Sequence, residues 1–263
     1  MDLMVLKDGE KSQRMHIMSK NVAFYDKVWA DDCYAKGLSP TLRRRQIIHF
    51  IQKYTPGSGL MLLDLGCGKG YLAEALSRLG QVTGVDFAAE TVQQNKQRFS
   101  HITFVCGDVI DLALPQRLAQ YDVVVSSEVI EHIEIADRAQ LLRNVDAVLR
   151  PGGLFIVTTP YRNSILRLKP PDESETTFFA RFEDQPISSI MSKEELIAAL
   201  EPYFEVVGFA SVQPCIKNRL LDYLWKVLFW PLNYRLVNNV TNALGIEGKY
   251  MVVVARKPVT GQV

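Results

Sequence analysis

The sequence predicts an α/β fold: a doubly wound, mostly parallel seven-stranded sheet with an antiparallel last strand, an N-terminal helical cap and a helical insertion before that strand. Two observations lead to this prediction. From about residue 60, short β-branched or Leu-rich runs alternate with segments of helical apolar spacing, which is typical of a parallel sheet covered by helices. The last two strand-like runs depart from this repeat, so we expect them to pair antiparallel around an insertion.

Each predicted strand ends in a polar or Gly-rich turn. In chain order the strands are Met61–Leu65, Val82–Asp86, Ile102–Cys106, Tyr121–Ser126, Leu154–Thr159, Phe204–Phe209 and Met251–Ala255. The helix signals are Ser39 as an N-cap before Pro40, the stripe Leu72, Leu76 and Leu79 ending at Gly80, the stripe Leu141, Val145, Val148 and Leu149 ending at Pro151-Gly152-Gly153, and the capping box Ser192 to Glu195. We expect these helices to pack on the sheet.

The composition excludes several classes of protein. Of 263 residues, 48% are apolar and 22% charged, which indicates a folded globule rather than a disordered chain. A net charge of +1 provides no broad basic field for nucleic acid, although Arg43, Arg44 and Arg45 could form a local patch. The four cysteines form no CxxC pair, and the first residues do not resemble a signal peptide. We therefore expect a cytoplasmic protein without a thiolate metal site.

Four regions are expected along the chain. They are a helical cap or lid at 1–58, a core at 59–212, an aromatic-rich insertion at 213–248, and the last strand with a tail at 249–263. The insertion carries Trp225, Phe229 and Trp230, which could pack in the core, cover a lipophilic ligand, join two subunits or rest on a membrane surface through 216–236. Its modest number of basic residues disfavours the membrane. We expect a monomer or a homodimer.

The most informative segment runs from Asp64 to Gly70, where a buried strand leads into a glycine-rich turn and a helix. Gly66, Gly68 and Gly70 carry no side chains that would keep a ligand from the backbone, and Asp64 lies at the carboxyl end of its strand, where open α/β sheets bind ligands. A tight turn without a ligand would use the same glycines. Tyr71 stands where a dinucleotide fingerprint needs its third glycine, so the pattern differs from that fingerprint.

The segment resembles the first motif of the class I, Rossmann-like S-adenosylmethionine-dependent methyltransferases, D-x-G-x-G-x-G. Asp64 to Gly70 matches every specified position, and the resemblance extends over roughly residues 60 to 160. It continues at Val82–Asp86, Gly107-Asp108, Tyr121-Asp122 and Pro151-Gly152-Gly153. The resemblance implies S-adenosylmethionine as cofactor and S-adenosylhomocysteine as product.

Asp86 follows Gly66 by 20 residues at the end of the next strand, where a carboxylate can accept both ribose hydroxyls of a nucleoside. The resemblance further implies that Phe87 offers an apolar face to adenine and that Asp108 accepts its amine. The residues expected at the cofactor are Asp64, Gly66, Cys67, Gly68, Gly70, Asp86, Phe87, Asp108, Val109 and Ser127.

An E-x-x-E-H segment, Glu128 to His132, follows the fourth strand. If it is helical, Glu128, Glu131 and His132 share one face and could hold a divalent metal. The segment resembles both metal-dependent small-RNA 2′-O-methyltransferases and ubiquinone-pathway O-methyltransferases, and also enzymes without metal. No later histidine could complete a site, so we predict no metal. We assign catalysis to His132, as the base, and Glu128; the alternative is that His132 only caps the loop.

We expect the methyl acceptor to be a small molecule that is methylated on an oxygen atom. The aromatic insertion could accommodate a lipophilic acceptor. Tyr25, Tyr161 and Arg162 are the candidate acceptor-binding residues. Three alternatives remain. They are a metal-dependent RNA 2′-O-methyltransferase, a non-catalytic S-adenosylmethionine-binding module, and a nicotinamide dehydrogenase.

Overall fold

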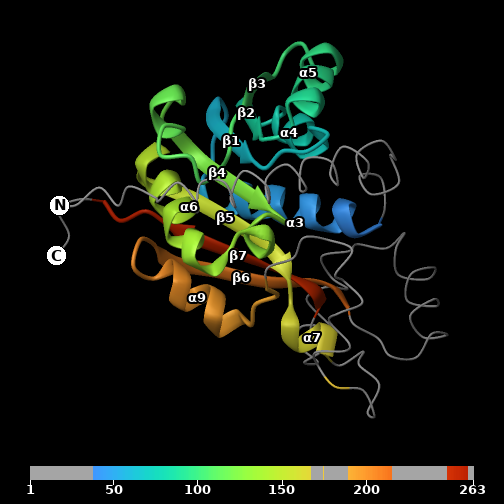
Figure 1. The fold of residues 1–263 in the computed structure, drawn as a ribbon, viewed down its shortest axis with the longest axis vertical. Coiled ribbons are helices and arrows are strands. Elements are labelled where there is room, and N and C mark those ends of the chain that lie inside the picture. The colour runs from blue at the N-terminus through green and yellow to red at the C-terminus, as the bar shows by residue number, and fades with distance from the viewer. Residues whose placement is uncertain (1–37, 167–173, 175–188, 215–247, 260–263) are drawn as a thin grey trace, which may run out of the picture.

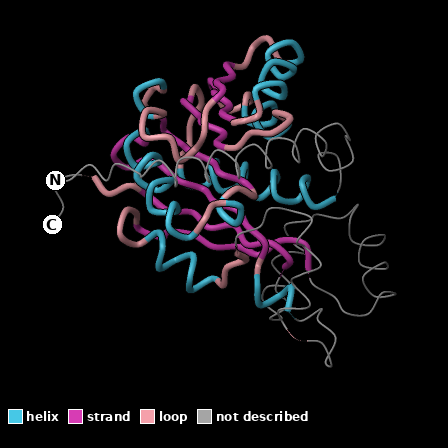
Figure 2. Tube along the Cα trace, in the orientation of Figure 1, coloured by secondary structure: helices cyan, strands magenta, loops and turns pink. Residues whose placement is uncertain are grey.

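A seven-stranded sheet with helices on both faces forms the molecule in the computed structural model, which describes residues 38–166, 174, 189–214 and 248–259 (Figure 1; Figure 2). The strand order is β3-β2-β1-β4-β5-β7-β6. The strands are β1 (Leu60–Leu65), β2 (Gly80–Asp86), β3 (Thr103–Cys106), β4 (Tyr121–Ser127), β5 (Leu149–Pro160), β6 (Glu205–Pro214) and β7 (Gly248–Arg256). The predicted fold class is confirmed.

The helices divide between the two faces of the sheet. They are α3 (Leu38–Tyr54), α4 (Tyr71–Leu76), α5 (Ala89–Arg98), α6 (Ile135–Val148), α7 (Arg162–Leu166) and α9 (Lys193–Leu200), with short 3₁₀ turns η1 (Pro115–Arg117) and η2 (Ile130–His132). Apolar residues of α3, α4 and α5 pack into one core, and those of α6 and α9 into a second core on the opposite face. This division is the doubly wound arrangement.

The sheet is parallel from β3 through β5, and β7 runs antiparallel to both β5 and β6. The predicted antiparallel pairing of the last two strands is therefore confirmed. Because β1, β2, β4 and β5 are parallel, their carboxyl ends meet at one edge of the sheet. We call this edge the ligand edge, since open α/β sheets bind ligands there.

Three predicted boundaries are wrong. Pro151-Gly152-Gly153 does not end a helix in a loop but lies inside β5, where the pairing shifts from Tyr121–Leu149 to Val123–Leu154. Gly152 has a φ of 77°, which this irregularity in the strand pairing requires.

The other two errors concern helix ends. Helix α4 ends at Leu76, and Gly80 is the first residue of β2. Glycine is needed at this position because a Cβ there would lie 2.0 Å from the Leu60 carbonyl oxygen. Helix α3 begins at Leu38, so Ser39 is not its N-cap. The capping box at Ser192 is confirmed, since the Ser192 side chain accepts from the Glu195 amide.

Several predictions fall outside the described residues. These are Tyr25, the first 37 residues of the cap, and residues 215–247 of the insertion, which include all of the suggested membrane contact at 216–236. The four region boundaries remain predictions. Among the residues that the structure describes, no helix is both long and apolar enough to cross a membrane.

Candidate active site

The glycine-rich loop after β1 is held by the backbone of β2. The amides of Gly66 and Cys67 both donate to the Val85 carbonyl at 2.8 Å, and the Gly70 amide donates to the Cys67 carbonyl at 2.9 Å. Gly66, Gly68 and Gly70 have φ values of 82°, 47° and 73°, a region that residues with a Cβ rarely adopt. The three glycines are therefore required by the loop's own conformation.

Asp86, at the end of β2, holds this loop from the side. Its Oδ2 accepts from the Gly68 amide at 2.8 Å, its Oδ1 accepts from the Ala88 amide at 3.0 Å, and the residue is 5% exposed. Each carboxylate oxygen has a second lone pair, so the two amides leave acceptor capacity for a ligand's hydroxyl groups.

Asp64 and Cys67 are buried on the β1 side of the loop. Burial raises the pKa of Asp64 to about 7, a hydrogen bond from the Ala73 amide opposes that rise, and the nearby Asp86 adds to it. Within the described part of the chain, Asp64 Oδ2 has no hydrogen-bond partner. Burial also raises the pKa of the Cys67 thiol, so the thiol is neutral and does not act as a nucleophile.

Phe87, Asp108 and Val109 lie where β2 and β3 end side by side. Asp86 pairs with Cys106, so Phe87 and Asp108 follow adjacent strand ends, and both are half-buried. Asp108 Oδ1 accepts from the Ile110 amide at 3.1 Å, while Val109 is buried. The structure thus brings the predicted adenine residues to the same corner of the ligand edge as Asp86.

On the other side of β1, a chain of hydroxyl groups leads to Glu128. Thr158 Oγ1 donates to Glu128 Oε1 at 2.8 Å and lies 2.9 Å from Ser127 Oγ, so the Ser127 hydroxyl is the donor to Thr158. Glu128 has a φ of 59°, uncommon for a residue with a Cβ, and its amide donates to the Thr158 carbonyl. Such strained backbone occurs most often at functional sites.

Arg43 of α3 is a functional candidate that the sequence analysis did not place at the ligand edge. It was considered only as part of a surface patch, whereas its Nε lies 3.7 Å from Glu128 Oε1 and its guanidinium stacks 4.3 Å from the centre of the Tyr250 ring. Burial raises the pKa of Glu128, while Arg43 and the Thr158 hydroxyl lower it. The helix before the sheet therefore contributes a cation to the ligand edge.

Glu131 and His132 follow in η2, not in an α-helix. Glu131 is 1% exposed, and burial, with a smaller contribution from Glu128, holds its pKa well above its ordinary value. His132 Nε2 lies 4.0 Å from Glu131 Oε1. Because the Glu128 backbone has a left-handed conformation just before the 3₁₀ turn, the residues of the E-x-x-E-H segment do not lie on one face of a helix. In the described ranges no cluster of three or more His, Cys, Asp or Glu could hold a metal.

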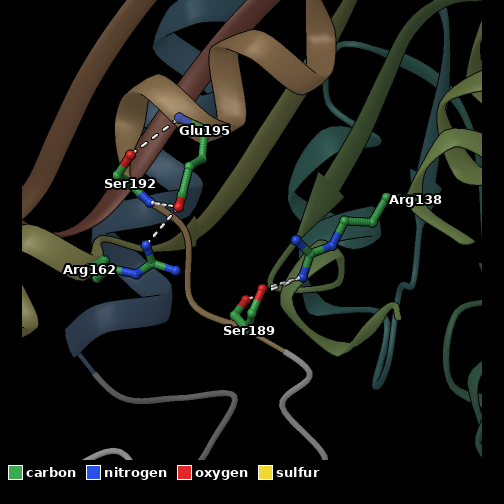
Figure 3. Close-up of polar contacts among 5 residues, drawn as sticks. All are labelled: Arg138, Arg162, Ser189, Ser192 and Glu195. Atoms are coloured by element: carbon green, nitrogen blue, oxygen red, sulfur yellow. Dashed lines mark hydrogen bonds and ion pairs between the residues drawn. The ribbon is translucent and has the colours of Figure 1, made fainter. Parts of the chain in front are cut away.

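The η2 turn is held in place by Arg138 of α6. Arg138 Nε donates to the Ile133 carbonyl at 3.2 Å, and Arg138 Nη2 donates to Ser189 Oγ at 2.8 Å (Figure 3). The Ser189 amide donates in turn to the Glu131 carbonyl at 3.3 Å. These contacts fix the backbone on both sides of His132, so the imidazole has a defined place at the ligand edge.

Tyr161 and Arg162, predicted to bind the acceptor, have other partners in this structure. Tyr161 is buried and meets the Phe209 ring edge-on at 6.3 Å. Arg162 donates to Glu195 Oε1 at 2.7 Å, which ties the start of α7 to the capping box of α9 (Figure 3). The role of both residues toward an acceptor remains a prediction.

Comparison with known proteins gives a match over the centre of the chain. Residues 63–157 match the family model described as "Methyltransferase domain". The chain is 33% identical over 153 residues to a "Probable S-adenosylmethionine-dependent methyltransferase" of Mycolicibacterium smegmatis, covering 58% of this chain and 52% of that relative. It is 39% identical over 111 residues to a "Ubiquinone biosynthesis O-methyltransferase" of Bradyrhizobium, covering 40% of this chain and 42% of that relative. The chain thus spans about half the length of the curated relatives it matches.

The fold has a solved counterpart. The N-methyltransferase NodS of Bradyrhizobium japonicum, crystallised with S-adenosyl-L-homocysteine, aligns with a TM-score of 0.60 at 16% identity, over 90% of this chain and 99% of that one. The described core therefore has the same fold as this N-methyltransferase.

Proposed function

We propose that this protein is an S-adenosylmethionine-dependent methyltransferase that methylates a small molecule on oxygen. The observation that carries the proposal is the clamped glycine loop beside Asp86, at the ligand edge of a sheet whose centre matches a methyltransferase domain. The match to ubiquinone-pathway O-methyltransferases supports oxygen as the accepting atom. The near-neutral net charge supports a small molecule over a nucleic acid.

The residues present fit the cofactor. Asp64 Oδ2, buried beside the loop and lacking a hydrogen-bond partner among the described residues, provides an acceptor for a polar or cationic group. Asp86 is suited to the ribose hydroxyls, and Phe87 with Asp108 to the adenine. Cys67, Val109 and Ser127 complete the proposed contacts.

When bound, S-adenosylmethionine supplies a methyl group on a positively charged sulfur, so the protein's main tasks are to bind, align and exclude water. Arg43 and Thr158 orient the Glu128 carboxylate, and Arg138 fixes the turn that carries His132. With the cofactor and the acceptor bound, His132 would take the proton of the acceptor hydroxyl on an imidazole nitrogen, while the bond from the methyl carbon to sulfur breaks and the bond from that carbon to oxygen forms. Glu128 is the second residue that we propose for catalysis, and the carboxylate oxygen beside the imidazole is Glu131 Oε1, 4.0 Å from His132 Nε2.

The finer features of the proposal rest on the sequence. The aromatic insertion favours an acceptor with an apolar part, and the separated cysteines favour a cytoplasmic location. The metal-dependent RNA enzyme is disfavoured because Glu128, Glu131 and His132 do not share a helical face.

The decisive experiment measures S-adenosylhomocysteine binding by calorimetry, then S-adenosylhomocysteine production from S-adenosylmethionine with a panel of phenols and catechols bearing apolar substituents. We expect binding, and turnover with at least one hydroxyl compound. The His132→Ala variant should lose most of the turnover and keep binding. His101→Ala is the matched control, since His101 is an exposed histidine paired with Glu74 at 2.8 Å.

Three results would contradict parts of the proposal. If the wild type does not bind S-adenosylhomocysteine, the methyltransferase assignment is wrong. Binding without turnover on the panel or on a cell extract would indicate a non-catalytic binding module. The same compounds are also tested with an amine in place of each hydroxyl group. Turnover with these amines alone would overturn oxygen as the accepting atom.

A further inference from the structure

Both polar groups of Gly68 are held by side chains from other elements. Its amide donates to Asp86 Oδ2 at 2.8 Å, and its carbonyl accepts from Asn95 Nδ2 at 2.6 Å. Asp86 belongs to β2 and Asn95 to α5, so the middle of the glycine loop is gripped from two directions. We call this pair of hydrogen bonds the Gly68 clamp.

Asn95 occupies a position that packing alone would give to an apolar residue. It is 2% exposed, in the middle of α5, beside the buried Val92. Asparagine is a poor residue for a helix interior, and burying its amide is unfavourable unless the amide is hydrogen-bonded. The bond to the Gly68 carbonyl satisfies this need, so the loop contact accounts for an asparagine at this site.

The clamp also determines how α5 sits on the loop. Asn95 Cγ would be 3.3 Å from a Cβ placed on Gly70, so the amide plane lies against the last glycine of the motif. Asp86 Oδ1 accepts from the Ala88 amide, which precedes the first residue of α5. Asp86 and α5 therefore hold the loop as one unit, and removing either bond lets the Gly68 peptide groups rotate.

We propose that Asn95 is a positioning residue for the cofactor: it fixes the Gly68 peptide groups so that the loop is shaped for S-adenosylmethionine before binding. The inference rests on the proposed function, because the loop's ligand is the proposed cofactor. It adds a residue that does not belong to the glycine motif and does not need to touch the ligand. Its loss should weaken cofactor binding and leave acceptor recognition unchanged.

The first test replaces Asn95 with leucine, which has the same branched heavy-atom skeleton but no donor for the Gly68 carbonyl. The Asn95→Leu variant should bind S-adenosylhomocysteine about 30-fold more weakly in calorimetry, because the loop must be ordered during binding. Its KM for S-adenosylmethionine should rise, while kcat and the KM for the acceptor stay close to wild type. Gln94→Leu is the matched control, an amide-to-leucine change on the exposed side of the same helix.

The second test uses Asn95→Asp, whose carboxylate cannot donate to the Gly68 carbonyl when ionised. Protonation restores one donor, and the burial of position 95 favours the protonated form. The affinity of this variant for S-adenosylhomocysteine, expressed relative to wild type at each pH, should therefore recover as the pH falls from about 8 to about 6. Such a recovery would show that the protonation state of residue 95, and not its volume, controls the affinity. This variant also replaces the leucine variant if the latter does not fold.

Hydrogen exchange separates failure of the inference from failure of the proposed function. The amides of Gly68 to Gly70 should exchange faster in Asn95→Leu than in wild type, without any ligand present. If the wild type binds no S-adenosylhomocysteine, the proposed function is wrong, and the exchange rates still test the clamp. If a folded Asn95→Leu variant binds the ligand within about twofold of wild type, or exchanges at the same rate, Asn95 has no positioning role.

Discussion

The carboxylates on the two sides of the ligand edge differ in how fully they are hydrogen-bonded. On the β2 side, each oxygen of Asp86 accepts a backbone amide, and the loop it holds is gripped again by Asn95. On the β4 side, the buried Glu131 lies near the half-buried Glu128, whose Oε1 is 3.7 Å from Arg43 Nε. Among the described residues, Glu131 Oε2 has no hydrogen-bond partner.

The difference indicates a division of labour. Satisfied hydrogen bonds make the β2 side rigid, which suits the binding of a large cofactor in one pose. Crowded, buried carboxylates with raised pKa values are costly to keep, and such groups gather where protons or charge are handled. We therefore propose that the β2 side binds the cofactor and that the β4 side handles the acceptor.

The largest effect is expected at the contact between the two sides. A Cβ on Gly66 would lie 2.3 Å from Val129 Cγ2, and Gly66 has a φ of 82°. Gly66→Ala should lower the free energy of unfolding by about 4 kcal/mol, because it combines a clash with backbone strain. Chemical denaturation would measure it. Adding Val129→Ala should recover part of the loss, and strict additivity of the two changes would show that the sides do not meet here.

The second prediction separates the two sides by ligand binding. In Asp86→Asn, the side-chain NH2 group would face one of the two backbone amides that donate to Asp86 in the wild type, so two donors would oppose each other. The affinity for S-adenosylhomocysteine should therefore fall about 100-fold in calorimetry. Glu128→Gln should leave that affinity within about twofold and reduce turnover instead. Equal losses of affinity in the two variants would remove the proposed division.

The third prediction concerns pH. Burial raises the pKa of Asp64 from 3.8 to about 7, so the folded state binds this proton more tightly than the unfolded state. The stabilisation is complete at low pH and is lost as the pH rises through about 7. Wild type should lose about 2.5 kcal/mol more stability than Asp64→Asn between about pH 5 and pH 8 in urea denaturation. Glu205→Gln, an exposed carboxylate on β6, should follow wild type, and parallel curves for Asp64→Asn would contradict the raised pKa.

The smallest effect is expected away from both sides. Ser192 accepts from the Glu195 amide at 3.2 Å and caps α9. Ser192→Ala should lower the free energy of unfolding by about 1 kcal/mol, measured by thermal or chemical denaturation. S-adenosylhomocysteine affinity should not change. A change in that affinity would mean that α9 is coupled to the ligand edge.

The sequence was sufficient for features that follow from local pattern. Alternating apolar runs predicted the strands and their class, and three glycines after a buried strand predicted the loop, because only glycine adopts those backbone angles freely. The positions of Arg43 and Asn95 could not be predicted. Each acts on a residue more than 25 positions away, and such a contact leaves no periodic signal along the chain.

Two features of the sheet's edge differ from local expectation because of tertiary contacts. The Glu128 to His132 segment was considered as a helix, but Glu128 adopts a left-handed conformation that residue type does not reveal. Pro151-Gly152-Gly153 has the composition of a loop, yet the neighbouring strand takes it into β5 as an irregularity. In both places tertiary contacts override the local preference.

The position of β7 has a consequence for biosynthesis. This strand is the last that the structure describes, yet it lies between β5 and β6, and β6 has no other strand partner in the described sheet. While the protein is being made, β5 has an open edge until residues 248–256 leave the ribosome. A nascent chain stalled before that point would expose this edge of β5 and leave β6 without a partner, which makes the chain a substrate for chaperones and a template for aggregation.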